Sequence, residues 1–400
     1  MPRPALELAD IFRQHGPGYR HRHNLPIAHL KVMRAIESCR TAVLGGHMEQ
    51  CGHCSHQRIA YNSCRNRHCP KCQTLAKQQW LDQRKRELLP IPYFHVVFTV
   101  PAPISDIALQ NKTALFQILF RTSAKTLLTI AADPKHLGAT IGFFSILHTW
   151  GQNLLFHPHV HCVVTGGGLS HDHNWIACRR PDFFLSVHVL SRLFRRLFLE
   201  ALQQAYEHGE LQFHGQLKSL GDPESFARFL QPALGVKWVV YAKRPFGGPQ
   251  QAVEYLGRYT HRIAISNQRL LGFDNGQVTF QYKDYRAADP QRSRQMTLAT
   301  DEFTRRFLLH VLPPGFQRIR HYGLSANRFR AETIACCRQL LVGPRSVLLP
   351  EPQQLLHEDL QVRIVDCAAR CPLCKVGFLV RVSQVLPIRW SCPPLAPDTS

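Results

Sequence analysis

The chain has 400 residues, of which 44% are hydrophobic and 10% aromatic, so it can bury a sizeable core and is not a disordered tail. Lysine and arginine number 49 against 27 acidic residues, which gives a formal net charge of +22. This balance favours a polyanionic partner, with nucleic acid ahead of an anionic membrane surface. No apolar run reaches membrane-spanning length and no signal-peptide pattern opens the chain, so we expect a protein of the cytoplasm or the nucleoid.

The first 90 residues are rich in cysteine and histidine. A helix is predicted over residues 27–45, and two Cys-x-x-Cys turns follow it. Each such turn supplies two thiolates from one tight loop, and zinc prefers four soft ligands arranged as a tetrahedron. We therefore expect one Zn²⁺ site, in a module of the zinc-ribbon or treble-clef type, made by Cys51, Cys54, Cys69 and Cys72.

Further ligand-type and basic residues lie around these turns. Cys64 and His68, together with Cys39 and His47, either form a second metal site or simply line the module. The basic side chains on its loops are expected to contact DNA phosphates, with a solvated face as the alternative; they are Arg65, Arg67 and Lys71. Prolines at the end of this segment indicate a boundary, which makes residues 1–90 the first expected domain.

Residues 91–325 alternate short strands with helices and form the second expected domain. Strands are predicted over 93–101, 142–150, 159–168 and 236–246, and helices over 107–131, 187–207 and 248–259. The third strand is expected to end in a glycine turn at residues 166–168, and the run at 274–276 (Asp-Asn-Gly) predicts a hairpin. Because strands and helices are interspersed, we expect an α+β fold with a largely antiparallel sheet.

One stretch of this segment carries the residues of a metal site. Side chains alternate along a strand, so His159 and His161 share one face while Val160 points into the core. With 23 histidines in the chain, such a triplet is weak evidence by itself. A hard cation on two histidines needs a further ligand, and the candidates in order of preference are His148, Gln152 and His157.

Two tyrosines follow about ninety residues later. Tyr255 and Tyr259 are four residues apart, so on a helix their phenols share one face; packing of both rings against the sheet is the alternative. A metal ion and a tyrosine together can open a phosphodiester by covalent attack. Arg258 and Arg262 are expected beside the DNA backbone, or else on a solvated basic face.

These features in this order resemble the HUH endonucleases, in which U is a hydrophobic residue. More closely, the chain resembles the two-tyrosine transposases of the insertion-sequence ninety-one family, which carry an N-terminal zinc-binding domain. The similarity runs from about residue 47 to residue 328 and is strongest in the segments NSCRNRHCPKCQ, HTWGQNLLFHPHVHCVVTGGG, VVYAKRPFGG and EYLGRYTHRIAISNQRLL. The resemblance implies an HUH (Rep-like) core and rolling-circle transposition, with single-stranded DNA at insertion-sequence ends and target DNA as partners.

The resemblance also implies a chemistry for these residues. The histidines would hold Mg²⁺ or Mn²⁺, with Zn²⁺ as the competing assignment. Tyr255 or Tyr259 would attack phosphorus and leave a 5′-phosphotyrosine and a free 3′-OH, and two tyrosines allow a second covalent link. No Walker-type glycine-rich loop is present in the sequence, so we expect no nucleotide cofactor.

Residues 326–400 form the third expected domain. Cys371 and Cys374 make a further knuckle-like turn, which together with Cys367 and Cys392 either forms a second Zn²⁺ site, as in a zinc ribbon, or binds no metal. The last eight residues have the composition of an unstructured tail.

Two other functions remain open at this point. A plasmid or phage rolling-circle replication initiator would use the same chemistry in a different DNA context. A non-catalytic, zinc-dependent DNA-binding regulator would use the histidines structurally, and it would keep all its activity without the two tyrosines. The sequence does not indicate an oligomeric state.

Overall fold

The computed structural model of the chain describes residues 6–72, 78, 80–82, 85, 87–180, 184–243, 257, 263–283, 293–326, 330–342 and 370–388. The chain divides into two compact units. The larger unit comprises Met1–Leu6 and Thr74–Arg345, and the smaller unit comprises Glu7–Gln73 and Ser346–Ser400. The C-terminal segment therefore folds with the N-terminal module, and this differs from the three successive domains that the sequence suggested.

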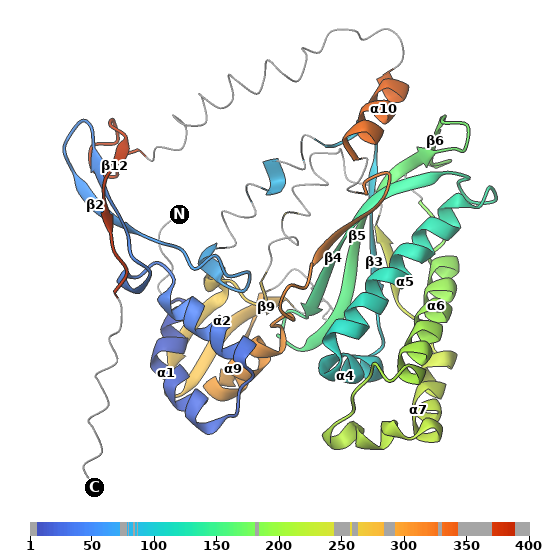
Figure 1. Cartoon of the computed structure of the whole chain (residues 1–400), viewed down its shortest axis with the longest axis horizontal. Helices are drawn as coiled ribbons and strands as arrows, with labels where there is room; N and C mark the ends of the chain where they lie inside the picture. Colours follow the sequence, from blue (N-terminus) through green and yellow to red (C-terminus); the bar gives the residue numbers. More distant parts are fainter. Residues whose placement is uncertain are drawn as a thin grey trace. The chain divides into compact units, whose positions relative to one another are not determined.

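A six-stranded antiparallel sheet forms the centre of the larger unit (Figure 1). Its strand order is β11-β4-β5-β3-β7, and β6 pairs with the far end of β5. The strands are β3 (Tyr93–Thr99), β4 (Thr140–Trp150), β5 (Phe156–Leu169), β6 (Trp175–Ala177), β7 (Val240–Lys243) and β11 (Ile319–Gly323). The expected α+β fold with a largely antiparallel sheet is confirmed.

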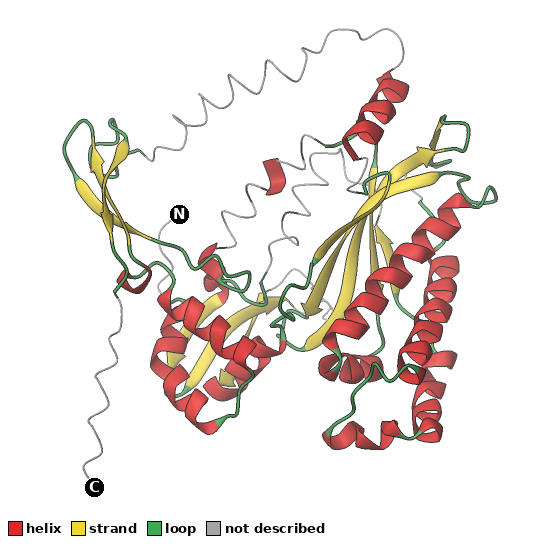
Figure 2. Ribbon diagram, in the orientation of Figure 1, coloured by secondary structure: helices red, strands yellow, loops and turns green. Residues whose placement is uncertain are grey.

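Helices cover one face of this sheet, and Figure 2 shows the longest of them lying beside each other along it. They are α4 (Ala102–Gln110), α5 (Lys112–Ala132), α6 (Val187–Glu207) and α7 (Pro223–Gly235), with a 3₁₀ turn η2 (Gly215–Gly221) before α7. Alternate residues of β5 enter the core beneath them, among them Val160, Cys162 and Val164. Val160 thus faces the core as the sequence predicted, which leaves its two histidine neighbours on the opposite face.

A smaller antiparallel sheet follows in the larger unit. It consists of β8 (Leu270–Asp274), β9 (Gln277–Lys283) and β10 (Ser293–Ala299), preceded by the 3₁₀ turn η3 (Asn267–Arg269) and followed by α9 (Thr300–Leu309). The predicted hairpin is confirmed, since β8 and β9 join at Asn275 and Gly276, whose φ angles are 49° and 69°. Helix α10 (Arg330–Val342) is the last described element of this unit.

The glycine triplet does not form the expected turn, because β5 continues through it to Leu169. A Cβ on Gly168 would lie 2.3 Å from the carbonyl oxygen of Thr140, and one on Gly167 would lie 2.6 Å from that of Ile176. Real side chains do not tolerate such distances, so glycine is required here for close approach of neighbouring strands.

The smaller unit begins with two helices, α1 (Leu8–Arg22) and α2 (Ile27–Ser38), of which α2 is shorter than the helix predicted over residues 27–45. The sequence did not suggest α1, which contains Pro17 between two glycines; its buried Leu8, Ile11 and Phe12 nevertheless fix it in place. After the turn η1 (Ala42–Leu44) comes a three-stranded sheet in the order β12-β1-β2, made of β1 (Gly46–Cys51), β2 (Gln57–Tyr61) and β12 (Leu379–Val385). None of the helices among the described residues has the length and apolarity needed to cross a membrane.

Candidate active site

Three histidines from two neighbouring strands form a cluster on the face of the larger sheet opposite helices α5 and α6, where Phe144, Ile146 and Val163 belong to a second hydrophobic cluster. His148 lies on β4 opposite His159 on β5, and His161 follows two residues along. One ring nitrogen from each lies within 4.8 Å of the others. His148 and His161 are buried and His159 is half-buried, so the cluster is open on the His159 side. Imidazole nitrogens bind divalent cations at about 2.0–2.1 Å, and nitrogens this close converge on a volume suited to one ion.

The hydrogen bond of His159 fixes which of its nitrogens is available. Its Nδ1 lies 2.7 Å from the main-chain oxygen of His157, and a carbonyl oxygen only accepts, so Nδ1 carries the proton. The lone pair is then on Nε2. A ligating histidine that donates its other N–H to a carbonyl is the usual arrangement at protein metal sites.

His161 is oriented by a fourth histidine that the sequence analysis missed. His95 on β3 is buried, its Nε2 lies 2.8 Å from Nδ1 of His161, and the two rings stack at 5.0 Å with an angle of 9°. If His161 ligates through Nε2, its Nδ1–H donates to His95, which must then be neutral. Burial, together with the positive charge of Lys243, lowers the pKa of His95 to about 4, so a neutral imidazole is available there at neutral pH.

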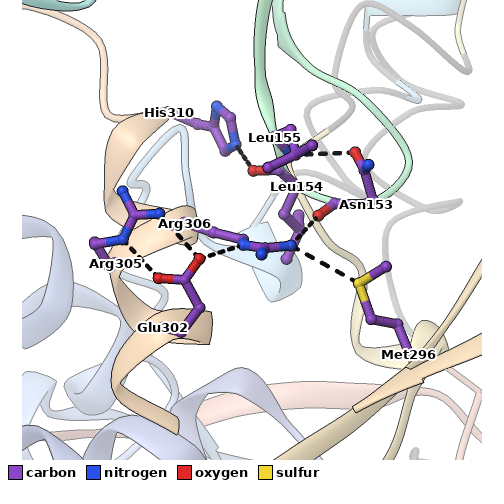
Figure 3. A network of polar contacts seen from close by, with 8 residues as sticks. All are labelled: Asn153, Leu154, Leu155, Met296, Glu302, Arg305, Arg306 and His310. Atoms are coloured by element: carbon purple, nitrogen blue, oxygen red, sulfur yellow. Dashed lines mark hydrogen bonds and ion pairs between the residues drawn. The ribbon is translucent and has the colours of Figure 1, made fainter. Parts of the chain in front are cut away.

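The turn that joins β4 to β5 is held at three successive main-chain carbonyls. Those of Gln152, Asn153 and Leu154 accept hydrogen bonds from Arg269, Arg306 and His310 respectively. Figure 3 shows the last two of these contacts. Since the turn lies between His148 and His159, its anchoring fixes how the two strands present their imidazoles.

Helix α9 supplies Arg306, one of these anchors, and holds it by ion pairing. Nε of Arg306 donates to Oε1 of Glu302 at 2.6 Å, and Arg305 binds both oxygens of the same carboxylate (Figure 3). The two guanidinium groups, Arg305 foremost, lower the pKa of Glu302 to about 2. Arg306 also donates to the sulfur of Met296 at 3.8 Å, so its guanidinium is fixed from three sides.

His310 is fully enclosed just after α9. Its Nε2 donates to Leu154 at 3.0 Å, and its Nδ1 accepts from the hydroxyl of Thr149 at 3.2 Å. Lys112 donates to the carbonyls of Leu309 and Val311, on either side of His310. Burial and the Lys112 charge lower the pKa of His310 to about 3, so this imidazole is neutral in the folded protein.

Arg269 connects three separate segments. Its Nη2 donates to Gln152, its Nη1 donates to Ala264 at 3.4 Å, and its Nε donates to Gln281 of β9 at 2.7 Å. Ala264 is buried and lies five residues after the second tyrosine of the sequence motif. The β4–β5 hairpin, which carries the histidine cluster, is called the metal hairpin. One guanidinium thus connects the turn of this metal hairpin to the chain that follows the two tyrosines.

The two tyrosines, together with the neighbouring arginines, lie outside the described residues; they are Tyr255, Tyr259, Arg258 and Arg262. The chain on either side of them is described. β7 pairs with β3 so that Lys243 lies opposite His95, and the chain is described again from Ile263, which is buried. Gly257, midway between the tyrosines, is buried, and a Cβ there would lie 2.5 Å from Leu81.

The structure also describes the other predicted ligands and the basic residues of the smaller unit. The ring of His157 is exposed and does not belong to the group of three. The main-chain carbonyl of Gln152 accepts a hydrogen bond from Arg269, and a ligand role for its side chain stays a prediction. Lys71 does not present its charge to solvent as a DNA contact would, since its side chain is 12% exposed and pairs with the buried carboxylate of Glu7 at 2.5 Å. Arg65 is exposed and Arg67 is half-buried, so both remain candidates.

The cysteines of the smaller unit form two tetrads, and neither has the composition expected for the first zinc site. Cys69 and Cys72 group with Cys39 and Cys64, which the sequence had left over; His68 is not part of this group. The other turn groups with the C-terminal one, as Cys51, Cys54, Cys371 and Cys374. The expected pairing of the first two turns is thereby corrected, because strand pairing and not sequence proximity brings the turns together. Cys367 and Cys392 lie outside the described residues.

Two family models match the chain. Residues 142–332, which include the histidine cluster and both tyrosines, match a family described as "Putative transposase". Residues 11–100 match a transposase zinc-binding domain. No solved structure matches the chain.

Two relatives match over most of their length. "Putative transposase y4qJ" of Sinorhizobium fredii is 55% identical over 388 residues, which cover 96% of each chain. The transposase for insertion sequence element IS801 of Pseudomonas savastanoi pv. phaseolicola is 30% identical over 350 residues, which cover 85% of this chain and 82% of the relative. The chain therefore belongs to the insertion-sequence ninety-one family of transposases, which carry an N-terminal zinc-binding domain, as its sequence motifs had indicated.

The contact between His95 and His161 generates a prediction about metal affinity. Replacing His95 by leucine removes the acceptor that orients His161, so Mn²⁺ affinity of the protein should fall by roughly 10- to 100-fold. His95→Gln, whose amide oxygen can accept the same proton, should recover part of the loss. Isothermal titration with Mn²⁺ measures both, with the exposed His171→Gln as the control. Equal Mn²⁺ affinity in all four proteins would contradict a positioning role.

The buried His310 generates a prediction about acid stability. Its pKa is lowered on folding, so between pH 6.5 and 3 the unfolded chain takes up a proton that the folded protein does not. Stability is therefore lost as the pH falls through this window, by about 1.4 kcal/mol per pH unit at most. From pH 7.5 to 5.5, His310→Gln should lose about 1.4 kcal/mol less stability than wild type does.

Urea unfolding followed by tryptophan fluorescence can test this, because four of the five tryptophans belong to the larger unit: Trp80, Trp150, Trp175 and Trp238. His171→Gln, at an exposed position, should behave as wild type. An unchanged pH dependence in His310→Gln would show that this imidazole is not kept neutral by folding.

Proposed function

We propose that this transposase nicks single-stranded DNA at the ends of its insertion sequence by tyrosine attack and transfers the strand by a rolling-circle route. The three-histidine cluster is the observation on which this proposal depends most. Two of its imidazoles have their Nδ1 atoms engaged, by His157 and by His95, so each has Nε2 left as its metal-binding atom. The cluster lies in the segment that matches the transposase family.

The donor set fits a divalent cation at His148, His159 and His161. Three imidazoles favour Mn²⁺ or Zn²⁺ over Mg²⁺, which prefers oxygen ligands and retains its water. A cation bound there would supply charge to polarise the scissile phosphate and to stabilise its pentavalent state. The half-buried His159 leaves the open side of the cluster for a phosphate oxygen.

Topology supports delivery of a tyrosine to this cluster. The chain enters the tyrosine segment from β7, where Lys243 pairs with His95 beside the cluster. It leaves the segment at Ala264, which Arg269 connects to the turn of the metal hairpin. Both ends of the segment are thus held by elements that build the metal site, so a nucleophile on it operates within a fixed frame.

The chemical step is a phosphoryl transfer without an external energy source. The phenol oxygen of Tyr255 or Tyr259 forms a bond to phosphorus while the bond to the 3′ oxygen breaks, giving a 5′-phosphotyrosine. The departing oxygen takes up a proton and becomes a free 3′-OH. A phenol loses its proton near pH 10, so a base must accept the phenolic proton as the attack proceeds. Reversal by a new 3′-OH completes strand transfer.

The basic character of the chain suits this substrate. Its net charge of +22 favours the phosphate backbone, and we place Arg258, Arg262, Arg65 and Arg67 along the DNA path. The cytoplasm, at the nucleoid, is the corresponding location. The transposase relatives favour a mobile element over a plasmid or phage replication origin. The following test distinguishes a non-catalytic regulator from the transposase and from the replication initiator, which both cut DNA.

Removal of both tyrosines should abolish covalent attachment to DNA. With labelled single-stranded element-end DNA and Mn²⁺, wild type should give a protein–DNA adduct on a denaturing gel, and Tyr255→Phe plus Tyr259→Phe should give none. Each single variant should retain one of the two links and thereby rank the nucleophiles. Tyr241→Phe, at an exposed position on β7, is the matched control. DNA bound tightly by wild type without any adduct would favour the regulator.

Loss of the Arg269 guanidinium should slow the chemical step selectively. Arg269→Ala, and also Arg269→Lys, cannot bridge three carbonyls, so the tyrosine segment and the metal hairpin lose their common anchor. The first-order rate of adduct formation should fall on the order of 10- to 100-fold. The Kd for DNA and for Mn²⁺ should stay within about three-fold, because Arg306 and His310 still hold the β4–β5 turn beneath the histidine cluster. Arg121→Ala, exposed on α5, serves as the control. A parallel loss of Mn²⁺ affinity and rate would show that Arg269 acts on the hairpin alone.

A further inference from the structure

The second cysteine tetrad joins two turns that are far apart in the chain. Sγ of Cys51 lies 3.7 Å from Sγ of Cys374, and Sγ of Cys54 lies 3.6 Å from Sγ of Cys371, 317 residues further on. Four sulfurs bound to zinc at 2.3 Å in a regular tetrahedron are separated by about 3.8 Å. A disulfide needs about 2.05 Å, so these distances fit a shared metal and exclude bonded cystines.

The two turns have the same backbone conformation. The N–H of Ser55 donates to the carbonyl of Cys51 at 3.1 Å, and the N–H of Lys375 donates to that of Cys371 at 3.0 Å. Ser55 and Lys375 both have a positive φ, 57° and 58°. Two unrelated stretches of sequence thus adopt one uncommon turn, and this turn is the form in which a Cys-x-x-Cys pair directs both thiolates to one side.

Main-chain amides are directed at the sulfur atoms. The N–H of Cys54 lies 3.5 Å from Sγ of Cys51, and the N–H of Gly377 lies 3.4 Å from Sγ of Cys374. Donors in these positions stabilise thiolates, the form in which cysteine binds metal. A Cβ on Gly377 would lie 2.6 Å from Sγ of Cys51, so only glycine allows the two turns to approach this closely.

The strands beyond the turns continue the same contact. β12 pairs antiparallel with β1 from Cys51 opposite Leu379 to Gly46 opposite Val385. Leu379 is buried against Cys51 and Cys371. The tetrad thus lies at one end of a continuous three-stranded sheet, as in a zinc ribbon. One of its two turns comes from the N-terminal part of the chain and the other from the C-terminal part.

The first tetrad is complete without these residues. Cys39, Cys64, Cys69 and Cys72 have sulfurs as close as 3.5 Å and lie within the segment that matches the zinc-binding domain. That segment ends at residue 100 and contains neither Cys371 nor Cys374. A single zinc ion therefore accounts for one tetrad and leaves the other unassigned.

We propose that Cys51, Cys54, Cys371 and Cys374 bind a second, structural zinc ion, which fastens the C-terminal strand β12 to the N-terminal unit. The larger unit is then inserted between two segments that the ion holds together. Closing so long a loop removes conformational freedom from the unfolded chain, in the way that a long-range cross-link does. The site is independent of the histidine cluster, so it can be tested without any measurement of nicking.

Metal content tests the number of ions. Native mass spectrometry of the full chain should show one zinc ion fewer in Cys371→Ser plus Cys374→Ser than in wild type. Cys39→Ser plus Cys64→Ser should also lose one zinc ion, and Cys336→Ser, at an exposed position on α10, should lose none. The same zinc count in wild type and in the Cys371→Ser plus Cys374→Ser protein would overturn the proposal.

Cleavage of the intact chain tests the fastening and covers the case in which the double variant fails to fold. A specific protease site is inserted between residues 350 and 360 of the otherwise wild-type chain, with an affinity tag at the N-terminus. After cleavage, the fragment beginning near residue 360 should remain bound to the tagged part and should be released by a zinc chelator. Release without chelator, or retention at zinc-free conditions, would contradict a fastening by this ion.

Discussion

The hydrogen bonds that hold the β4–β5 turn are the interaction on which the histidine cluster depends. Short connecting turns are ordinarily the most mobile part of a hairpin. Here Arg269, Arg306 and His310 each take one of three successive carbonyls. Because the acceptors belong to the main chain, this restraint acts on the backbone itself and sets the angle at which both strands leave the turn. The imidazoles inherit a fixed geometry before any cation is bound, which is the condition for preorganised electrostatics.

Local periodicity made part of this site predictable. A period of two places His159 and His161 on one face and Val160 in the core, and no knowledge of other strands is needed. His95 comes from another strand, and its contact with His161 depends on the register of β3 against β5, which no local pattern encodes. A lone histidine in the apolar run of residues 93–99 was the available signal. Arg269 gave no signal, since its partners are carbonyl oxygens.

The cysteines also show that a local sequence pattern does not identify partners that are far apart in the chain. Spacing identifies a Cys-x-x-Cys turn reliably, but it does not say which two turns share an ion. Proximity in sequence suggested the turns at residues 51 and 69, whereas pairing of β1 with β12 joins residue 51 to residue 371. Lys71 was similarly assigned to DNA on its charge alone, although the buried carboxylate of Glu7 neutralises it. In each case the residue type alone fitted two roles equally well, and a contact between residues far apart in sequence decided which role the residue has.

The pairing of β1 with β12 also sets an order of events during synthesis. Cys54 leaves the ribosome 317 residues before Cys371, which at bacterial translation rates of about 5–20 residues per second is a delay on the order of tens of seconds. Throughout that interval the larger unit can fold while β1 is paired with β2 alone and its opposite edge has no partner strand. The sheet of the smaller unit closes only after β12 has been synthesised. A polypeptide that terminates before β12 leaves this sheet one strand short, so the fold of the smaller unit reports whether translation has passed through the larger unit.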